Sequence, residues 1–498
     1  MQKPLSFVSE NTWSFLRDAM INPSGFREYD ARWKYPEEIN LPGISALGLG
    51  LGTQIQDRKI EPVIVVGHDY RDYSVSIKNA LVIGLIQAGI NVKDIGPALS
   101  PMAYFAQFYL NVPAVAMVTA SHNPNGWTGV KMGFDRPLTH GPEEMAELRD
   151  IVLNGKGRIR SGGEYKFVDG VREAYIDDLA GDFKMSRKLN VVCATGNGTT
   201  SAFAPELFKR LGVNVVPSNN RLDYNFPNYN PNPEAMEMLH DMANTVKSSN
   251  ADFALGFDGD GDRCGVVDNE GEEIFADKVG VIIARELSKY HPGSTFVADV
   301  KSTGLFASDP ELKAHGAKAD YWKTGHSHMK RRIKEISALA GFEKSGHYFF
   351  AEPIGRGYDC GMRVAVEIFK LMDRNPKKSM ADLRKALPKT YSSPTMSPYC
   401  ADDQKYQVLE RIIKKIRQKA DNDGTLSGRK IEQVITVNGA RIILDNGAWG
   451  LVRASSNTPN LVVVCESPES EQELREIFND LDAIIRTEPG VGDYDQTL

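Results

Sequence analysis

Three aspartates alternate with glycines in the run Asp258-Gly259-Asp260-Gly261-Asp262-Arg263. Glycine leaves the backbone free to turn, so the three carboxylates can converge on one point. Like charges at such a spacing repel strongly unless a cation lies among them. Carboxylate oxygens are hard ligands of the kind that Mg²⁺ prefers. The run therefore predicts a divalent metal site with Asp258, Asp260 and Asp262 as ligands.

Apolar segments on both sides predict that this acidic run lies on a turn between two strands. Residues 253–257 read Phe-Ala-Leu-Gly-Phe, and residues 265–267 read Gly-Val-Val. An EF-hand loop does not fit, because its sixth position holds Arg263 instead of Gly and its twelfth holds Asn269 instead of Glu. An acidic, solvated turn without a metal is the alternative.

A candidate nucleophile follows the strand-like segment 112–120, in the sequence Thr119-Ala-Ser121-His122-Asn-Pro-Asn-Gly. Residues at the carboxyl end of a strand in an α/β sheet lie where ligands bind, and Asn-Pro and Asn-Gly turn the chain sharply. Ser121 is thus the candidate, with an ordinary polar turn as the alternative. A Ser–His hydrolase is disfavoured because neighbours do not easily face each other and the Gly-x-Ser-x-Gly elbow is absent.

Two further segments are dense in short polar side chains. Glu343-Lys-Ser345-Gly-His347 lies between apolar anchors and suits the binding of sugar hydroxyls. Residues 453–459 place one guanidinium, that of Arg453, beside four small hydrogen-bonding side chains, a composition that can bind phosphate. A solvated turn is the alternative for the first segment and a capped turn for the second.

Composition excludes several classes of protein. The formal charge of −6 over 498 residues does not indicate binding to nucleic acid or to an anionic membrane. Neither a signal-peptide core nor an apolar run long enough to span a bilayer is present. Five scattered cysteines fit neither a disulfide framework nor a zinc site. We expect a cytoplasmic protein that binds neither nucleic acid nor membrane.

The chain shows a weak repeat in which an apolar strand runs into a polar turn, a helix and a Gly before the next strand. The strands that open the three copies begin near residues 63, 191 and 296. Such units predict three related α/β domains, with one large α/β fold as the alternative. Gly48 to Gly52 lacks a Walker lysine and follows no strand, so it predicts a helix or a turn.

The last hundred residues predict a fourth, α+β domain. One helix should bury Tyr406, Leu409, Ile412, Ile413 and Ile416, and strands should cover 431–437 and 440–444. A second helix should begin with Ser467 as its N-cap and bury the apolar positions 474, 477, 478 and 481. We place the domain limits at 1–170, 171–276, 277–392 and 393–498, with a hinge over 394–398.

Taken together, these segments resemble the α-D-phosphohexomutase superfamily, most closely its bacterial phosphomannomutase/phosphoglucomutase branch. The resemblance covers nearly the whole chain and includes 26–30 (Phe-Arg-Glu-Tyr-Asp) and 323–327 (Lys-Thr-Gly-His-Ser). It implies three α/β domains with mixed sheets plus a C-terminal α+β domain around a central cleft. It also implies an enzyme that interconverts hexose 1-phosphate and hexose 6-phosphate of mannose or glucose.

The resemblance also implies roles for individual residues. Ser121 would carry a phosphate that passes to the substrate through a hexose 1,6-bisphosphate, and glucose 1,6-bisphosphate would act as activator. Mg²⁺ would lie among the three aspartates and a phosphate oxygen of Ser121. Proton transfer and charge neutralisation would fall to Lys131, His326 and Arg32. Substrate binding would fall to Tyr29, Arg263, Lys301, Glu343, Ser345, His347, Arg453, Ser455, Asn457 and Thr458.

Three departures from the family pattern leave the preferred hexose open. They are the doubled serine at 455–456, Lys344 in the segment 343–347, and Trp33 at the position after Arg32, where the family has Gly. We expect hexose phosphates as the partners of a monomer or homodimer. A metal-dependent hydrolase and a non-enzymatic sugar-phosphate or calcium-binding protein are the alternatives. A mutase conserves phosphate on a serine, a hydrolase releases it, and a binder does neither.

Overall fold

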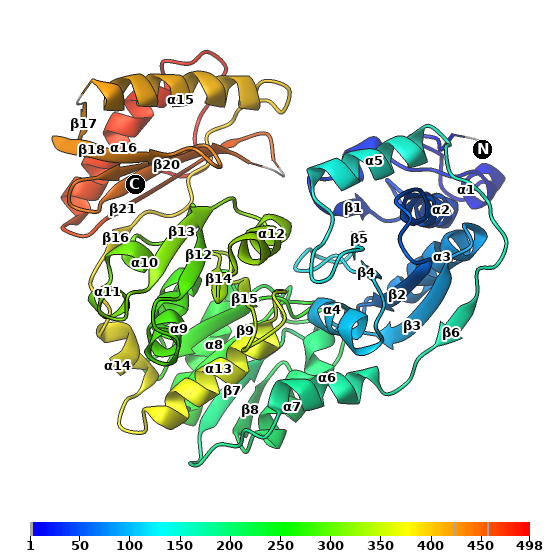
Figure 1. The fold of residues 1–498 in the computed structure, drawn as a ribbon, viewed down its shortest axis with the longest axis horizontal. Helices are drawn as coiled ribbons and strands as arrows, with labels where there is room; N and C mark the ends of the chain where they lie inside the picture. Colours follow the sequence, from blue (N-terminus) through cyan, green and yellow to red (C-terminus); the bar gives the residue numbers. More distant parts are fainter. Residues whose placement is uncertain (1–2, 423, 456–457) are drawn as a thin grey trace. The chain divides into compact units, whose positions relative to one another are not determined.

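The computed structural model describes residues 3–422, 424–455 and 458–498 (Figure 1). The chain forms two compact units. The first consists of Met1–Ala276 and Ser345–Ala381, and the second of Asp277–Lys344 and Asp382–Leu498. Among the described residues, no helix has the length and apolar character needed to cross a membrane.

The first sheet is mixed and has the strand order β1-β5-β4-β2-β3-β6. The neighbours β4, β2, β3 and β6 are parallel, whereas β5 is antiparallel to both β4 and β1. Every residue of the central strands β2 and β4 is buried, as expected for parallel strands covered on both faces. The strands are β1 (Ala31–Lys34), β2 (Val63–His68), β3 (Asn91–Pro97), β4 (Ala114–Val118), β5 (Trp127–Gly133) and β6 (Tyr165–Phe167).

The glycine run at 48–52 lies inside a helix, as predicted, and serves helix packing. A Cβ on Gly48 of α2 would lie 2.2 Å from the carbonyl oxygen of Leu81 in α3, and one on Gly84 would lie 2.0 Å from that of Ser45. Only glycine allows the two helices to approach so closely. The helices of this region are α1 (Trp13–Arg17), η1 (Pro23–Gly25), α2 (Leu41–Asp57), α3 (Ser74–Gln87), α4 (Ser100–Tyr109), α5 (Pro142–Leu153) and α6 (Val171–Ala180).

The second sheet has the order β11-β10-β9-β7-β8 and confirms that the acidic run joins two strands. Strand β9 is antiparallel to β10 and parallel to β7. The strands are β7 (Asn190–Ala194), β8 (Asn214–Ser218), β9 (Phe253–Phe257), β10 (Cys264–Asp268) and β11 (Glu273–Ile274). The first unit, to which this sheet belongs, also contains η2 (Thr199–Ala202), α7 (Ala204–Arg210), α8 (Met236–Ser249), β15 (Tyr348–Phe350) and α13 (Gly361–Arg374).

In the second unit, β13, β12 and β14 form a parallel arrangement with β12 in the middle. Its elements are α9 (Ala276–Tyr290), β12 (Thr295–Asp299), α10 (Leu305–Ser308), α11 (Pro310–Ala314), β13 (Lys318–Trp322), α12 (His326–Ile336) and β14 (Ala340–Phe342). Strands β2, β7 and β12 are those that the repeat predicted. Helix α14 (Met380–Lys385) precedes the C-terminal part.

The C-terminal sheet is antiparallel throughout, with the order β16-β21-β20-β19-β18-β17. Helices α15 and α16 pack together over one face of it (Figure 1). This is the predicted α+β domain. Its elements are β16 (Tyr391–Ser392), α15 (Lys405–Asp421), β17 (Thr425–Leu426), β18 (Arg429–Ile435), β19 (Ala440–Leu444), β20 (Trp449–Ala454), β21 (Leu461–Ser467) and α16 (Glu471–Ile485).

Two local predictions for this domain are wrong. Tyr406 is 55% exposed, and Val408 takes its place on the buried face of α15, because the helix begins only at Lys405. Ser467 ends strand β21, and Ser470 caps α16 instead by accepting a hydrogen bond from the Glu473 amide. The segment predicted as a hinge is paired with β21, since the Met396 amide donates to the Val463 carbonyl and the Val463 amide to that of Met396.

Candidate active site

Ser121 follows strand β4 in a strained, buried position. Its φ is +53°, in the left-handed region that residues other than glycine rarely adopt, and it is 1% exposed. The Ser121 amide donates to Thr119 Oγ1 (2.8 Å), and Arg71 donates to the Ser121 carbonyl (3.1 Å). Such strain persists only where surrounding groups fix it, and it is typical of functional sites. Here it directs the hydroxyl toward the acidic loop, where Ser121 Oγ donates to Asp258 Oδ2 at 3.2 Å.

The neighbouring histidine is closer than we expected from the sequence. His122 Nδ1 lies 3.4 Å from Ser121 Oγ, the long limit of a hydrogen bond, because the left-handed backbone at Ser121 folds the two side chains together. Burial, followed by the charges of Arg263 and Arg32, lowers the pKa of His122 well below its usual value. His122 is therefore neutral at this site.

The glycines of the acidic run have a packing role as well as a conformational one. A Cβ on Gly259 would lie 2.7 Å from the carbonyl oxygen of Ser121, so only glycine lets the two loops approach this closely. Gly261 has a φ of +74°, which L side chains rarely adopt. The alternation of aspartate and glycine thus has a physical cause at both glycine positions.

The three predicted metal ligands converge. One oxygen from each of Asp258, Asp260 and Asp262 lies within 4.8 Å of the others, and all three residues are fully buried. Lys131, on β5, donates to Asp260 Oδ2 (2.8 Å) and to Asp262 Oδ2. Among the described residues, Oδ1 of Asp260 and Oδ1 of Asp262 are buried without a hydrogen-bond partner. Buried carboxylate oxygens of this kind suit a divalent cation, so the residues present fit a metal.

The carboxylates differ in their pKa values. Burial, and then the charges of Asp262 and Asp260, raise the pKa of Asp258 well above its usual value. Burial also opposes the charge of Asp260, but hydrogen bonds from Lys131 and Ser100 contribute to a lowered pKa. Burial also opposes the charge of Asp262, but the charge of Lys131 contributes most to a lowered pKa. Burial lowers the pKa of Lys131, yet Asp260 and Asp262 raise it more, so Lys131 is a cation here.

Arg32, predicted as a catalytic residue, connects β1 to the Ser121 loop. It donates to the Ala120 carbonyl (3.2 Å) and to Asn123 Oδ1 (3.0 Å), and it pairs with Asp30 (3.0 Å). The structure thus places Arg32 beside Ser121. Tyr29 is half-buried in the bend at 28–30, directly before Asp30.

Arg263 and His347 lie together in the first unit with Asp359. Arg263 Nε donates to His347 Nε2 (3.0 Å), so the ring proton is on Nδ1, which donates to Asp359 Oδ2 (2.9 Å). Arg263 also pairs with Glu234 (2.8 Å). This chain of bonds fixes the orientation of both predicted binding residues beside Asp262, whose Oδ1 is 3.8 Å from His347 Nδ1. Ser345 is half-buried in the same loop.

In the second unit, Asp299 at the end of β12 holds three loops that carry predicted site residues. It accepts hydrogen bonds from Ser302 Oγ (2.5 Å), Thr324 Oγ1 (2.7 Å) and the Lys344 amide (3.2 Å). Burial opposes its charge, but Lys301 and these hydrogen bonds lower its pKa. Asp299 therefore brings together the loops of the three predicted residues Lys301, His326 and Glu343.

These three residues differ in burial. Glu343 is 1% exposed and accepts a hydrogen bond from the Gly325 amide (2.5 Å), next to His326. His326 is the first residue of α12 and is buried, with Lys330 Nζ 3.3 Å from its Nδ1. Lys301 is only half-buried in the loop after β12.

The predicted phosphate loop joins β20 to β21. Arg453, 7% exposed at the end of β20, donates to the Ala454 carbonyl (3.0 Å). Ser455 Oγ accepts hydrogen bonds from the Thr458 amide (3.2 Å) and from Thr458 Oγ1 (2.8 Å), so these two residues are bonded to each other. Ser456 and Asn457 lie outside the described residues.

Sequence reasoning missed several residues that support the site. Asp69 pairs with Arg71, which donates to the Ser121 and Asn123 carbonyls, so this pair holds the Ser121 loop. Asp69 follows β2 and Asp299 ends β12, and the carboxyl end of a parallel strand is the signal that could have identified both. No comparable signal exists for Asp359, which lies in an irregular segment before α13.

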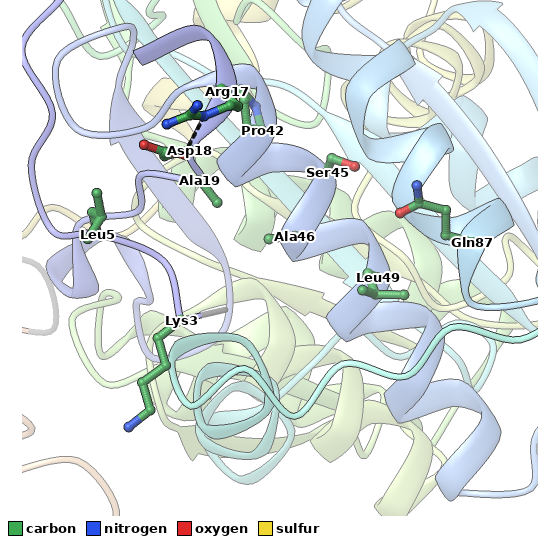
Figure 2. A pocket seen from close by; sticks show the side chains of 10 residues that line it. All are labelled: Lys3, Leu5, Arg17, Asp18, Ala19, Pro42, Ser45, Ala46, Leu49 and Gln87. Carbon is green, nitrogen blue, oxygen red and sulfur yellow. Dashed lines mark hydrogen bonds and ion pairs between the residues drawn. The ribbon is translucent and has the colours of Figure 1, made fainter. Parts of the chain in front are cut away.

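A separate cavity of about 270 Å³ lies beside α2 and contains none of the predicted site residues. Figure 2 shows Lys3, Arg17 and Asp18 at its edge, with Gln87 on the other side. Arg17, whose side chain is 78% exposed, pairs with Asp18 (3.1 Å). The lining of this cavity therefore shares no residue with the Ser121 site.

Comparison with known proteins gave matches over almost the whole chain. The models described as phosphoglucomutase/phosphomannomutase alpha/beta/alpha domains I, II and III match residues 23–158, 173–271 and 275–391, and that of the C-terminal domain matches 400–484. The phosphomannomutase/phosphoglucomutase of Pseudomonas putida is 32% identical over 95% of this chain and 97% of its own length. The phosphoglucomutase of Neisseria gonorrhoeae is 32% identical over 95% of this chain and 98% of its own.

Among solved structures, a phosphoglucomutase/phosphomannomutase family protein from Burkholderia thailandensis is similar to this chain with a TM-score of 0.85 and 29% identity. The match covers 95% of this chain and 99% of that one. These matches confirm the predicted fold class, in which three α/β domains precede a C-terminal α+β domain.

Proposed function

The chain belongs to the phosphoglucomutase/phosphomannomutase family, and we infer that it is an intramolecular phosphotransferase, an isomerase that interconverts hexose 1-phosphate and hexose 6-phosphate. We assign mannose, glucose or both as the hexose. The observation that best supports this function is the bond of 3.2 Å between Ser121 Oγ and Asp258, because it joins the candidate nucleophile to the acidic cluster across 137 residues of sequence.

We propose that the resting enzyme carries a phosphate on Ser121. In the first transfer, the bond between phosphorus and Ser121 Oγ breaks while one to O6 of a hexose 1-phosphate forms, giving a hexose 1,6-bisphosphate. The O6 hydroxyl loses its proton in this step, and Ser121 Oγ gains one. After the intermediate turns over, the phosphate at O1 returns to Ser121 and hexose 6-phosphate leaves. Phosphate is conserved in this cycle, so glucose 1,6-bisphosphate activates an enzyme that has lost its phosphate.

Asp258, Asp260 and Asp262 would hold Mg²⁺ together with a phosphate oxygen on Ser121. The acidic cluster supports a divalent cation, since Oδ1 of Asp260 and of Asp262 are buried with no hydrogen-bond partner in the part of the chain that the structure describes. When bound, Mg²⁺ withdraws negative charge from the transferring phosphoryl group. Catalysis of phosphoryl transfer depends mainly on such electrostatic stabilisation and on positioning.

The residues of the chain itself position and neutralise the reacting groups. Lys131 is a cation fixed against two carboxylates, so it neutralises charge, and Arg32 holds the loop that carries Ser121. We propose that His326, Lys131 and Arg32 assist proton transfer and charge neutralisation. Glu343 and Ser345 would bind ring hydroxyls, and Arg453, Ser455, Asn457 and Thr458 the phosphate. Tyr29, Arg263, Lys301 and His347 complete the binding residues.

The proposal is tested by the intact mass of the purified protein before and after incubation with glucose 1,6-bisphosphate. We expect one phosphate, lost in Ser121→Ala, and conversion of mannose or glucose 1-phosphate without release of inorganic phosphate. Steady release of inorganic phosphate would indicate the hydrolase instead. Binding of a sugar phosphate with neither conversion nor release of phosphate would instead support the non-enzymatic sugar-phosphate-binding protein.

We further propose that the enzyme works in the cytoplasm, as a monomer or homodimer. All five cysteines are buried free thiols. Such a set is typical of a reducing compartment.

A further inference from the structure

Arg441 of the C-terminal sheet contacts the backbone on both sides of Lys301. It lies on β19, is 1% exposed, and donates through Nη1 to the carbonyls of Val300 (2.7 Å) and Ser302 (2.7 Å). All of these residues belong to the second unit. One buried guanidinium nitrogen thus binds the two residues that flank a predicted substrate-binding lysine.

Two aromatic rings hold the Arg441 guanidinium in place. Its carbon lies 4.0 Å from the ring centre of Tyr321 and 3.7 Å from that of Trp449. The Tyr321 hydroxyl donates to the Thr303 carbonyl (2.7 Å), in the same loop. A planar cation stacked on aromatic rings in a buried site has little freedom, so the carbonyls that it binds are fixed as well.

Glu466, on β21, fixes the other end of this loop. It is 3% exposed and accepts hydrogen bonds through Oε1 from the Gly304 amide (2.7 Å), Thr303 Oγ1 (3.0 Å) and Trp449 Nε1 (3.0 Å). Strands β19, β20 and β21 therefore each contribute a side chain to the support of residues 300–304.

We propose that Arg441 is a positioning residue: by binding the carbonyls on both sides of Lys301, it sets the direction in which the Lys301 ammonium meets the hexose phosphate. The proposal rests on the assignment of Lys301 to substrate binding. Lys301 is half-buried, in a loop whose other residues are bonded to Arg441, Glu466 and Asp299. An anchored backbone reduces the entropy lost when a flexible lysine binds an anion.

The test is a double-mutant cycle with Arg441→Met, Lys301→Met and the double variant, assayed on glucose 1-phosphate and on mannose 1-phosphate. Methionine replaces the unbranched stem of the arginine side chain but lacks the guanidinium and cannot donate a hydrogen bond. We expect Arg441→Met to raise KM about tenfold with kcat within about threefold, because a binding contact is made equally in ground and transition states. In the Lys301→Met background, Arg441→Met should raise KM no further, since its effect passes through that lysine.

Arg441→Lys keeps the charge and a hydrogen-bond donor, so its KM should lie between those of the wild type and Arg441→Met. If the methionine variant does not fold, the KM of Arg441→Lys tests the proposal instead. Arg285→Met is the matched control. Arg285 is a buried arginine of the same unit that pairs with Asp309 and donates to the Ala386 carbonyl (3.2 Å). Its loss should lower the melting temperature and leave KM unchanged.

Additive effects in the cycle, or a wild-type KM in a folded Arg441 variant, would overturn the proposal. So would an unchanged KM in Lys301→Met, since the lysine would then have no binding role for Arg441 to position. These outcomes differ from failure of the proposed function, in which the wild-type protein itself would not convert either hexose phosphate.

Discussion

The loop between β9 and β10 and the loop between β20 and β21 both join adjacent antiparallel strands, yet they are built differently. In the first, Asp258, Asp260 and Asp262 are fully buried and bonded to Ser121, Ser100 and Lys131 from elsewhere in the chain. In the second, Thr458 is exposed, and its side chain bonds to Ser455 within the loop itself.

Charge explains the difference. Buried carboxylates that repel one another need partners fixed by folding, so the first loop is organised before any ligand binds. The hydroxyl groups of Ser455 and Thr458 carry no charge, so the loss of one partner costs much less than the loss of a partner of a buried carboxylate. Changes in the first loop should therefore alter catalysis, metal binding and stability together, whereas changes in the second should alter mainly substrate affinity.

The largest effect is expected at the residue that the first loop holds. Ser121→Ala should lower kcat by at least about a thousandfold, because the covalent step is lost. Assays of kcat at saturating glucose 1,6-bisphosphate measure this loss. Ser201→Ala is the control, since the Ser201 hydroxyl bonds to that of Thr195 (2.8 Å). An alanine variant with near wild-type turnover would exclude Ser121 as the nucleophile.

Neutralising one carboxylate of the first loop should separate catalysis from stability. Asp258→Asn should lower kcat about a hundredfold or more, since a bound cation contributes several kcal/mol to the transition state. It should also stabilise the metal-free protein by about 1 kcal/mol, because burial and two neighbouring carboxylates disfavour the charge of Asp258.

Asp260→Asn is the matched variant. It should destabilise the metal-free protein, because it weakens the buried pair with Lys131. The melting temperatures of Asp258→Asn and Asp260→Asn, measured in EDTA, test this difference. Equal changes of the same sign would contradict the conclusion that the charge of Asp258 is disfavoured and that of Asp260 is stabilised.

The first loop should also make metal binding depend on pH. Because the pKa of Asp258 is raised in the folded, metal-free protein, the protonated form contributes stability at low pH that is lost as pH rises through the folded pKa. A bound cation requires the ionised carboxylate, so its binding releases the proton. The gain in melting temperature from MgCl₂ should therefore grow with pH, and Asp258→Asn should flatten this trend. A gain that shrinks with rising pH would contradict it.

The smallest effect is expected in the second loop. Ser455→Ala removes the oxygen that binds Thr458, so KM for the hexose phosphate should rise about fivefold, a loss of about 1 kcal/mol. The kcat and the melting temperature should stay near wild type. A fall in melting temperature like that of Asp260→Asn would mean that the two loops do not differ in the way described.

Sequence reasoning identified the residues whose own type and spacing carry chemistry. The acidic run, the Ser121 turn and the strands around them were predicted, and the structure brings Ser121, Lys131, Arg32 and the three aspartates together. The predictions were less accurate at the ends of helices, for the first turn of α15 and for the N-cap of α16. Tyr406 and Ser467 were misplaced because a cap or a strand end depends on only one or two residues.

Supporting residues could not be found in this way. Asp359 orients His347, Asp299 joins three loops, and Arg441 binds the carbonyls beside Lys301. Asp359 and Arg441 are isolated charged residues, so no local spacing distinguishes them from solvated side chains. Asp299 differs, because its place at the end of a parallel strand could have indicated its role.

The sequence by itself determined the α/β framework, the acidic turn and the nucleophile candidate, because strand patterns and alternating Asp and Gly are local properties. Only the tertiary structure decided that Ser121 bonds to Asp258, that Lys131 neutralises two of the three carboxylates, and that Arg441 supports the Lys301 loop. The physical reason is that burial and pairing depend on which segments meet. Neighbours decide whether a buried charge is stabilised or raised in energy, and those neighbours lie far away along the chain.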